Sequence, residues 1–92
     1  MTVGTTAAAT EEQIESHVRA FLQQSAPLVA QAIAEMPRTA RLWDVVDSLS
    51  LLDLVAYLEQ TFQFTLDALE LIPDNFETIE SITSLVYEHL SR

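Results

Sequence analysis

The chain has 92 residues, a hydrophobic fraction of 49% and a formal net charge of −10, because 14 acidic residues face four basic ones. The length predicts one domain with a modest core, while the acidity disfavours nucleic acids and anionic membranes as partners. The chain contains no cysteine, which excludes disulfides, thiolate metal sites and a thiol nucleophile of its own.

Residues 1–9 are small and polar and show no period, which predicts a disordered N-terminal tail before a domain over residues 10–92. The tail lacks the basic and apolar regions of a secretion signal. No apolar run approaches the roughly 20 residues that a membrane span needs. We therefore expect a cytoplasmic protein without a membrane segment.

The first predicted helix begins after Thr10, because Thr10 and Gln13 have the spacing of a capping box. Apolar residues then recur at the spacing of one helical face, at Ile14, Val18, Phe21 and Leu22. Pro27 interrupts this pattern, which resumes over residues 28–36. Two interpretations remain open, which are a break near Ser25 with Ser25 capping a second segment, and a single kinked helix.

The second long helix is predicted over residues 48–62, after a loop over residues 38–46. The apolar anchors of this loop on the core are expected to be Leu42, Trp43, Val45 and Val46. One helix face is apolar, with Leu51, Val55, Leu58 and Phe62 spaced by four, three and four residues. The opposite face carries Ser50, Asp53, Tyr57 and Gln60. Because this second face lies next to Ser48, we expect it to be a docking surface.

The remaining chain predicts a short helix over residues 67–71 and a last helix that begins after Thr78 as its cap. The buried stripe of the last helix is Ile79, Ile82, Val86 and Leu90. A single glycine disfavours hairpin-rich β folds. The predicted fold is an all-α bundle of three main helices plus one short helix, with an extra helix in the first loop left open.

His17 and His89 fall on different predicted helices, with neither cysteine nor a trio of carboxylates nearby. Solvated histidines are therefore expected in place of a metal site. No set of nucleophile, base and orienting residue can be assembled, so the sequence predicts no enzyme.

The tripeptide Asp47-Ser48-Leu49 stands at the start of the second long helix, where Asp47 or Ser48 could simply act as a cap. The helix continues as Leu58-Glu59-Gln60-Thr61-Phe62, and the approach to the last helix reads Asn75-Phe76-Glu77-Thr78. Together these motifs, over the span from Leu42 to Leu90, resemble acyl and peptidyl carrier proteins. In that family the second helix begins with Asp-Ser-Leu and continues with Leu-Glu-x-x-Phe, and the last is preceded by Asn-Phe-x-Thr.

The resemblance implies that Ser48 carries 4′-phosphopantetheine as a covalent cofactor, whose thiol holds acyl or aminoacyl cargo as a thioester. It implies a monomer whose partners are a phosphopantetheinyl transferase, a cargo-loading ligase or acyltransferase, and downstream synthase enzymes. Negative charges on the partner surface are expected to steer basic partners. That surface is expected at Asp47, Leu49, Ser50, Asp53, Tyr57, Gln60, Asp67 and Glu70.

Three features depart from the family pattern. Val45 stands where carriers usually have glycine, residues 28–36 have a helical pattern where the family has a loop, and the second helix has only Asp53 and Glu59 as acids. These departures favour a free-standing carrier of a specialised polyketide or nonribosomal-type pathway, with a small polar or aminoacyl cargo held on the arm. The alternative is a small helical adaptor that binds proteins and has no prosthetic group.

Overall fold

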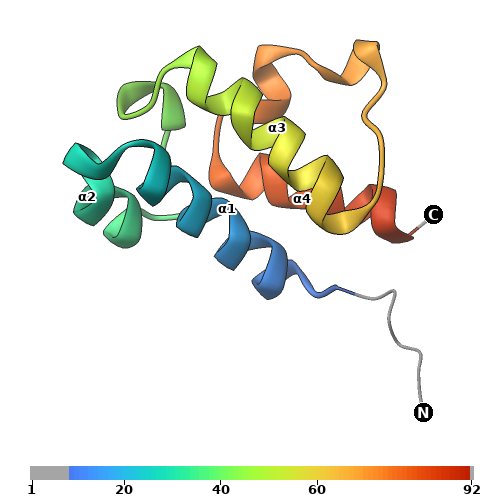
Figure 1. Cartoon of the computed structure of the whole chain (residues 1–92), viewed down its shortest axis with the longest axis horizontal. Coiled ribbons are helices and arrows are strands. Elements are labelled where there is room, and N and C mark those ends of the chain that lie inside the picture. The colour runs from blue at the N-terminus through green and yellow to red at the C-terminus, as the bar shows by residue number, and fades with distance from the viewer. Residues whose placement is uncertain (1–8, 92) are drawn as a thin grey trace.

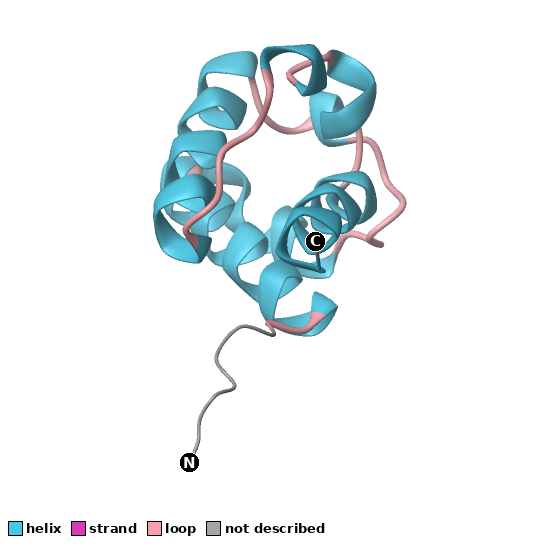
Figure 2. Cartoon of the chain, turned by 90° about the vertical axis from the view of Figure 1, so that its right-hand side faces the viewer, coloured by secondary structure: helices cyan, strands magenta, loops and turns pink. Residues whose placement is uncertain are grey.

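The computed structural model describes residues 9–91, and these form helices and loops without a β-sheet (Figure 1, Figure 2). The α-helices are α1 (Glu11–Ser25), α2 (Ala30–Glu35), α3 (Ser48–Phe62) and α4 (Ile79–Ser91). The predicted all-α bundle with three long helices is therefore confirmed. Of the predicted tail only Ala9 is described, and it packs against the core, while residues 1–8 lie outside the described residues. Within residues 9–91, no helix is both long and apolar enough to cross a membrane.

Helix α1 is the central packing element, because it contacts α2, α3 and α4. It begins with the predicted capping box, in which the N–H of Gln13 donates to the Thr10 hydroxyl oxygen at 3.1 Å and the Gln13 side chain accepts the N–H of Thr10 at 2.9 Å. Its buried face is Ile14, Val18 and Leu22. The predicted stripe is thus confirmed, with Phe21 half-buried at its edge.

Pro27 separates α1 from α2. Helix α1 ends at Ser25, and the 3-10 turn η2 (Pro27–Val29) leads into α2. The predicted break is confirmed and the single kinked helix is wrong. Ser25 is not the cap, because Ala26 precedes the turn and the fixed φ of Pro27 itself suits a first turn. The carbonyl of the fully buried Ile33 accepts a hydrogen bond from Arg19 Nη1 at 2.7 Å, which ties α2 to α1.

The loop between α2 and α3 is attached to the start of α4. The N–H of Leu42 donates to the carbonyl of Glu77 at 2.8 Å, and the N–H of Glu80 donates to the carbonyl of Arg38 at 2.9 Å. Leu42 is fully buried, whereas Trp43 is 37% exposed. Of the predicted anchors, Leu42 and Val46 are buried and Val45 packs against the core, so these are confirmed, whereas the prediction for Trp43 is wrong. Leu42 and Trp43 are neighbours in the 3-10 turn η3 (Leu42–Asp44), where successive side chains point about 120° apart.

Helix α3 buries Leu51, Leu54, Val55 and Leu58, which confirms its predicted apolar face. It ends at Phe62 and is capped by Gln63, whose φ of 60° is left-handed and whose N–H donates to the carbonyl of Glu59. Residues 64–78, called the connection below, then arch from the end of α3 back over its first half to the start of α4 (Figure 1).

The connection contains two 3-10 turns, η4 (Ala68–Glu70) and η5 (Pro73–Phe76). The short helix predicted over residues 67–71 is therefore the single turn η4. Helix α4 begins as predicted, because the Thr78 hydroxyl oxygen accepts the N–H of Ser81 at 2.9 Å. The buried residues Ile79, Ile82 and Val86 of α4 complete the core.

Candidate functional site

Ser48 is the first residue of α3, and its side chain is exposed. The helix is capped by its neighbour Asp47, whose Oδ1 accepts the N–H of Ser50 at 2.9 Å. The hydroxyl of Ser48 makes no hydrogen bond to any of residues 9–91. Asp47 thus performs the capping that could have explained a serine at this position. The Ser48 hydroxyl is left accessible to a reagent from solution.

The charge around this hydroxyl is set by Asp47 and by the helix end. The hydrogen bond from the backbone N–H of Ser50, together with the Ser50 hydroxyl, lowers the pKa of Asp47 below its ordinary value of 3.8. Asp47 is therefore ionised at neutral pH. The backbone N–H groups of Ser48 and Leu49 have no acceptor within the described part of the chain, as expected in a first helical turn. They present donors and the positive end of the helix dipole beside the hydroxyl.

An apolar groove of about 190 Å³, with Ser48 in its lining, lies between α3, the loop before it and the connection. Besides Ser48, its lining consists of aliphatic and aromatic residues. Leu52, Leu71 and Ile72 are exposed to solvent around it, so the groove is open. The full lining is Trp43, Ser48, Leu51, Leu52, Val55, Leu71, Ile72, Pro73 and Phe76.

The sequence reasoning above missed this groove. The sequence signal that could have indicated an apolar surface here is that Leu49 and Leu52 are large and apolar although they lie off the buried stripe of α3. The wall of the groove that faces α3 is formed by Leu71 and Ile72 of the connection. The sequence pattern of one helix does not show where a later segment folds back, so the groove itself could not be predicted.

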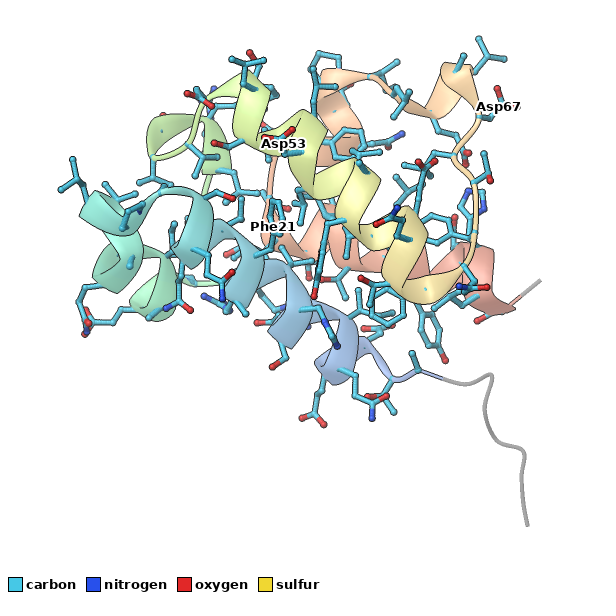
Figure 3. The ribbon with its side chains drawn as sticks, in the orientation of Figure 1. Phe21, Asp53 and Asp67 are labelled. Atoms are coloured by element: carbon cyan, nitrogen blue, oxygen red, sulfur yellow. The ribbon has the colours of Figure 1, made fainter. Side chains whose placement is uncertain are left out.

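The predicted partner residues lie at the start of α3, along α3 and on the connection. Asp53 is exposed on α3, and Asp67, also exposed, lies well away from it at the outer turn of the connection (Figure 3). Among the other predicted residues, Asp47, Leu49 and Gln60 are exposed, Ser50 is half-buried, and Tyr57 and Glu70 are half-buried with partners described next. Their contact with another protein stays a prediction.

Tyr57 points toward α1. Its hydroxyl lies 2.7 Å from Nδ1 of His17, and its ring stacks on Phe21, a residue of α1, with 4.8 Å between ring centroids. Glu70 meets His89, with 2.9 Å between each carboxylate oxygen and Nε2 of the histidine. The expectation that both histidines are merely solvated is therefore wrong. Neither belongs to a group of three metal-ligating side chains within residues 9–91.

Two exposed acids, Asp47 and Asp53, are chain neighbours of the groove residues Ser48 and Leu52. The arginines that the structure describes pair with glutamates, as in Arg19–Glu15 at 3.0 Å and Arg41–Glu77 at 3.9 Å. Asp53, the neighbour of the groove residue Leu52, has no ion pair with any described residue. Together with the ionised Asp47, this charge favours a basic partner at the groove.

Comparison of the chain with protein-family models, curated proteins and solved structures finds no significant match. The assignment of a function therefore rests on the residues of the site and on the motifs around Ser48.

Proposed function

We propose that the protein is a free-standing carrier that bears 4′-phosphopantetheine on Ser48 and presents acyl thioesters to partner enzymes. The observation that carries the proposal is the exposed Ser48 hydroxyl, which has no hydrogen-bond partner among the described residues because Asp47 already caps α3. The resemblance of the span from Leu42 to Leu90 to carrier proteins supports the same assignment.

The residues around Ser48 fit this group. A phosphodiester on the hydroxyl would be anionic, and the free N–H groups and dipole of the α3 N-terminus favour an anion there. When bound, phosphopantetheine supplies a thiol, which the chain itself lacks. The protein contributes a helix start held by Asp47 and an apolar groove whose lining includes the attachment point.

The groove changes the cargo that the sequence led us to expect. Its lining is almost wholly apolar, so a polar cargo placed there would lose hydration without gaining hydrogen bonds. An apolar group gains roughly 25 cal/mol for each Å² removed from water. A long chain among Leu54, Leu58 and Ile82 would have to displace residues that are already packed and inaccessible. We therefore propose a short apolar acyl group in place of the small polar cargo.

The attachment is tested by the intact mass of the protein after incubation with CoA and a broad-specificity phosphopantetheinyl transferase. The wild type should gain the mass of one phosphopantetheine, and Ser48→Ala should gain none while keeping its helical circular dichroism spectrum. Ser50→Ala, which removes a hydroxyl two residues away on the same first turn, is the matched control and should be modified. Continued modification of Ser48→Ala would refute the assignment.

A helical adaptor without a prosthetic group is the second candidate. It is favoured by the exposed apolar side chains of Leu49 and Leu52, which resemble a protein-binding patch. An unmodified wild type, in a reaction where the same transferase modifies a control carrier protein, would favour the adaptor.

A further inference from the structure

The outer wall of the groove belongs to a segment with little core of its own. Leu71 and Ile72 form this wall, and both remain nearly half exposed to solvent. The preceding turn η4 has no buried residue. Segments with few buried apolar contacts open at a low free energy. The wall therefore depends on polar contacts for its position.

Glu70, the residue before Leu71, supplies several of these contacts. Both oxygens of its carboxylate lie 2.9 Å from Nε2 of His89. Its Oε1 also accepts the N–H of Asp67 at 2.9 Å, and its backbone carbonyl accepts Nδ2 of Asn75 at 2.8 Å. The two contacts to Asp67 and Asn75 shape the connection, and the contact to His89 joins it to α4.

The Glu70–His89 contact has the properties of a strong hydrogen bond. The two side chains are only 21% and 11% exposed. A carboxylate only accepts hydrogen bonds, so Nε2 of His89 carries the hydrogen, and such charge-assisted bonds are about twice as strong as neutral ones. The ring of His89 also lies 5.3 Å from the ring of Phe64 at the start of the connection.

The Glu70–His89 contact lies between two points at which buried residues hold the connection. Towards its start the connection is held by Leu66, which is buried and donates its N–H to Glu59 of α3 at 2.8 Å. Towards its end it is held by the buried Phe76. Between these two points, the side chain of Glu70 on His89 fixes the segment to a helix of the core.

We propose that the Glu70–His89 pair positions the wall of the groove beside Ser48 and so determines how well the groove receives a group tethered there. The presence of a tethered group depends on the proposed function, whereas the positioning of the wall by Glu70 and His89 does not. With the pair intact, Leu71 and Ile72 line the groove together with Trp43. With the pair broken, the segment between Leu66 and Phe76 moves away from α3 and the groove loses its shape.

Native-state hydrogen exchange on the unmodified full chain tests whether the Glu70–His89 contact holds the connection in place. Glu70→Ala should lower the protection of amides in residues 66–75 by about tenfold, as expected for loss of a hydrogen bond to a charged group, and leave the amides of α1 unchanged. Glu70→Gln keeps a neutral acceptor oxygen for His89 and should restore part of the protection, since the bond loses its charge assistance. Asp74→Ala is the matched control, since Asp74 is an exposed acid of the same connection that makes no hydrogen bond to a described residue.

The groove has its own reporter, because Trp43 is the single tryptophan of the chain and lines it. Energy transfer from Trp43 to the neutral apolar dye phenylnaphthylamine measures whether the groove is formed. The dye should bind the wild type and Asp74→Ala alike, bind Glu70→Ala more weakly, and regain affinity in Glu70→Gln.

Several results would overturn the proposal. These are unchanged protection and dye affinity in Glu70→Ala, a Glu70→Gln variant as impaired as the alanine variant, and an equal loss of protection in α1. The last result would mean that the pair stabilises the whole bundle and has no specific effect on the wall. Because both measurements use the unmodified protein, a Ser48 that accepts no phosphopantetheine would remove the proposed function and leave this result standing.

Discussion

Replacing Tyr57 would show whether this residue supports the bundle or belongs to a partner surface. Its ring stacks on Phe21 at an interplanar angle of 23°, and its hydroxyl lies 2.7 Å from His17 Nδ1. His17 in turn makes an edge contact with the ring of Phe62, with 5.2 Å between ring centroids. Tyr57 is thus part of an aromatic cluster that joins α3 to α1.

The magnitude follows from what each substitution removes. Tyr57→Phe keeps the ring stack and removes one hydrogen bond, which contributes about 1 kcal/mol net. Tyr57→Ala also removes the ring. Loss of a fully buried aromatic ring costs about 3–5 kcal/mol, and a half-buried one roughly half of that. We therefore expect losses of about 1 kcal/mol for Tyr57→Phe and about 3 kcal/mol for Tyr57→Ala, the smaller of which lowers Tm by roughly 5 °C.

Urea unfolding followed by far-UV circular dichroism measures these losses, and the rate of phosphopantetheine transfer to Ser48 measures the partner contact. The matched control is Tyr87→Phe on α4, since the Tyr87 hydroxyl has no hydrogen bond to a described residue. That control should be as stable as the wild type. Unchanged stability of Tyr57→Phe combined with a slower transfer would refute the reasoning, because it would place the hydroxyl on a partner.

Three further predictions address charge and packing. Asp53→Lys should slow association with the transferase and weaken its salt dependence, because exposed acids on α3 steer a basic partner; equal initial rates at low salt would count against it. Asp47→Ala should lower Tm at neutral pH. The folded-state pKa of Asp47 is lowered, so its stabilisation is present above about pH 4 and is lost as the pH falls through that lowered pKa. Thermal unfolding between about pH 7 and pH 3 should therefore show the two proteins converging in acid, and a constant difference would contradict this. Ile33→Ala should cost about 2–4 kcal/mol in urea unfolding if α2 belongs to the core, whereas Ile72→Ala, at a residue 45% exposed, should cost much less.

The sequence determined the helices because the signals that start and bury them are local. The capping box at Thr10 and the cap at Thr78 each involve residues within three positions of one another. The apolar stripes of α1, α3 and α4 follow from the helical period alone. The position of Ser48 at the start of α3 is local in the same sense, so the proposed attachment point could be named from the sequence.

Tertiary structure alone decided what the remaining side chains touch. The bond between His17 and Tyr57 joins residues 40 positions apart, and that between Glu70 and His89 joins residues 19 positions apart. The helical period places Tyr57 on the face opposite the apolar stripe, yet α1 covers part of that face. The groove likewise exists only because the connection folds back over α3. Such contacts depend on how whole segments pack, which the pattern within any one segment does not contain.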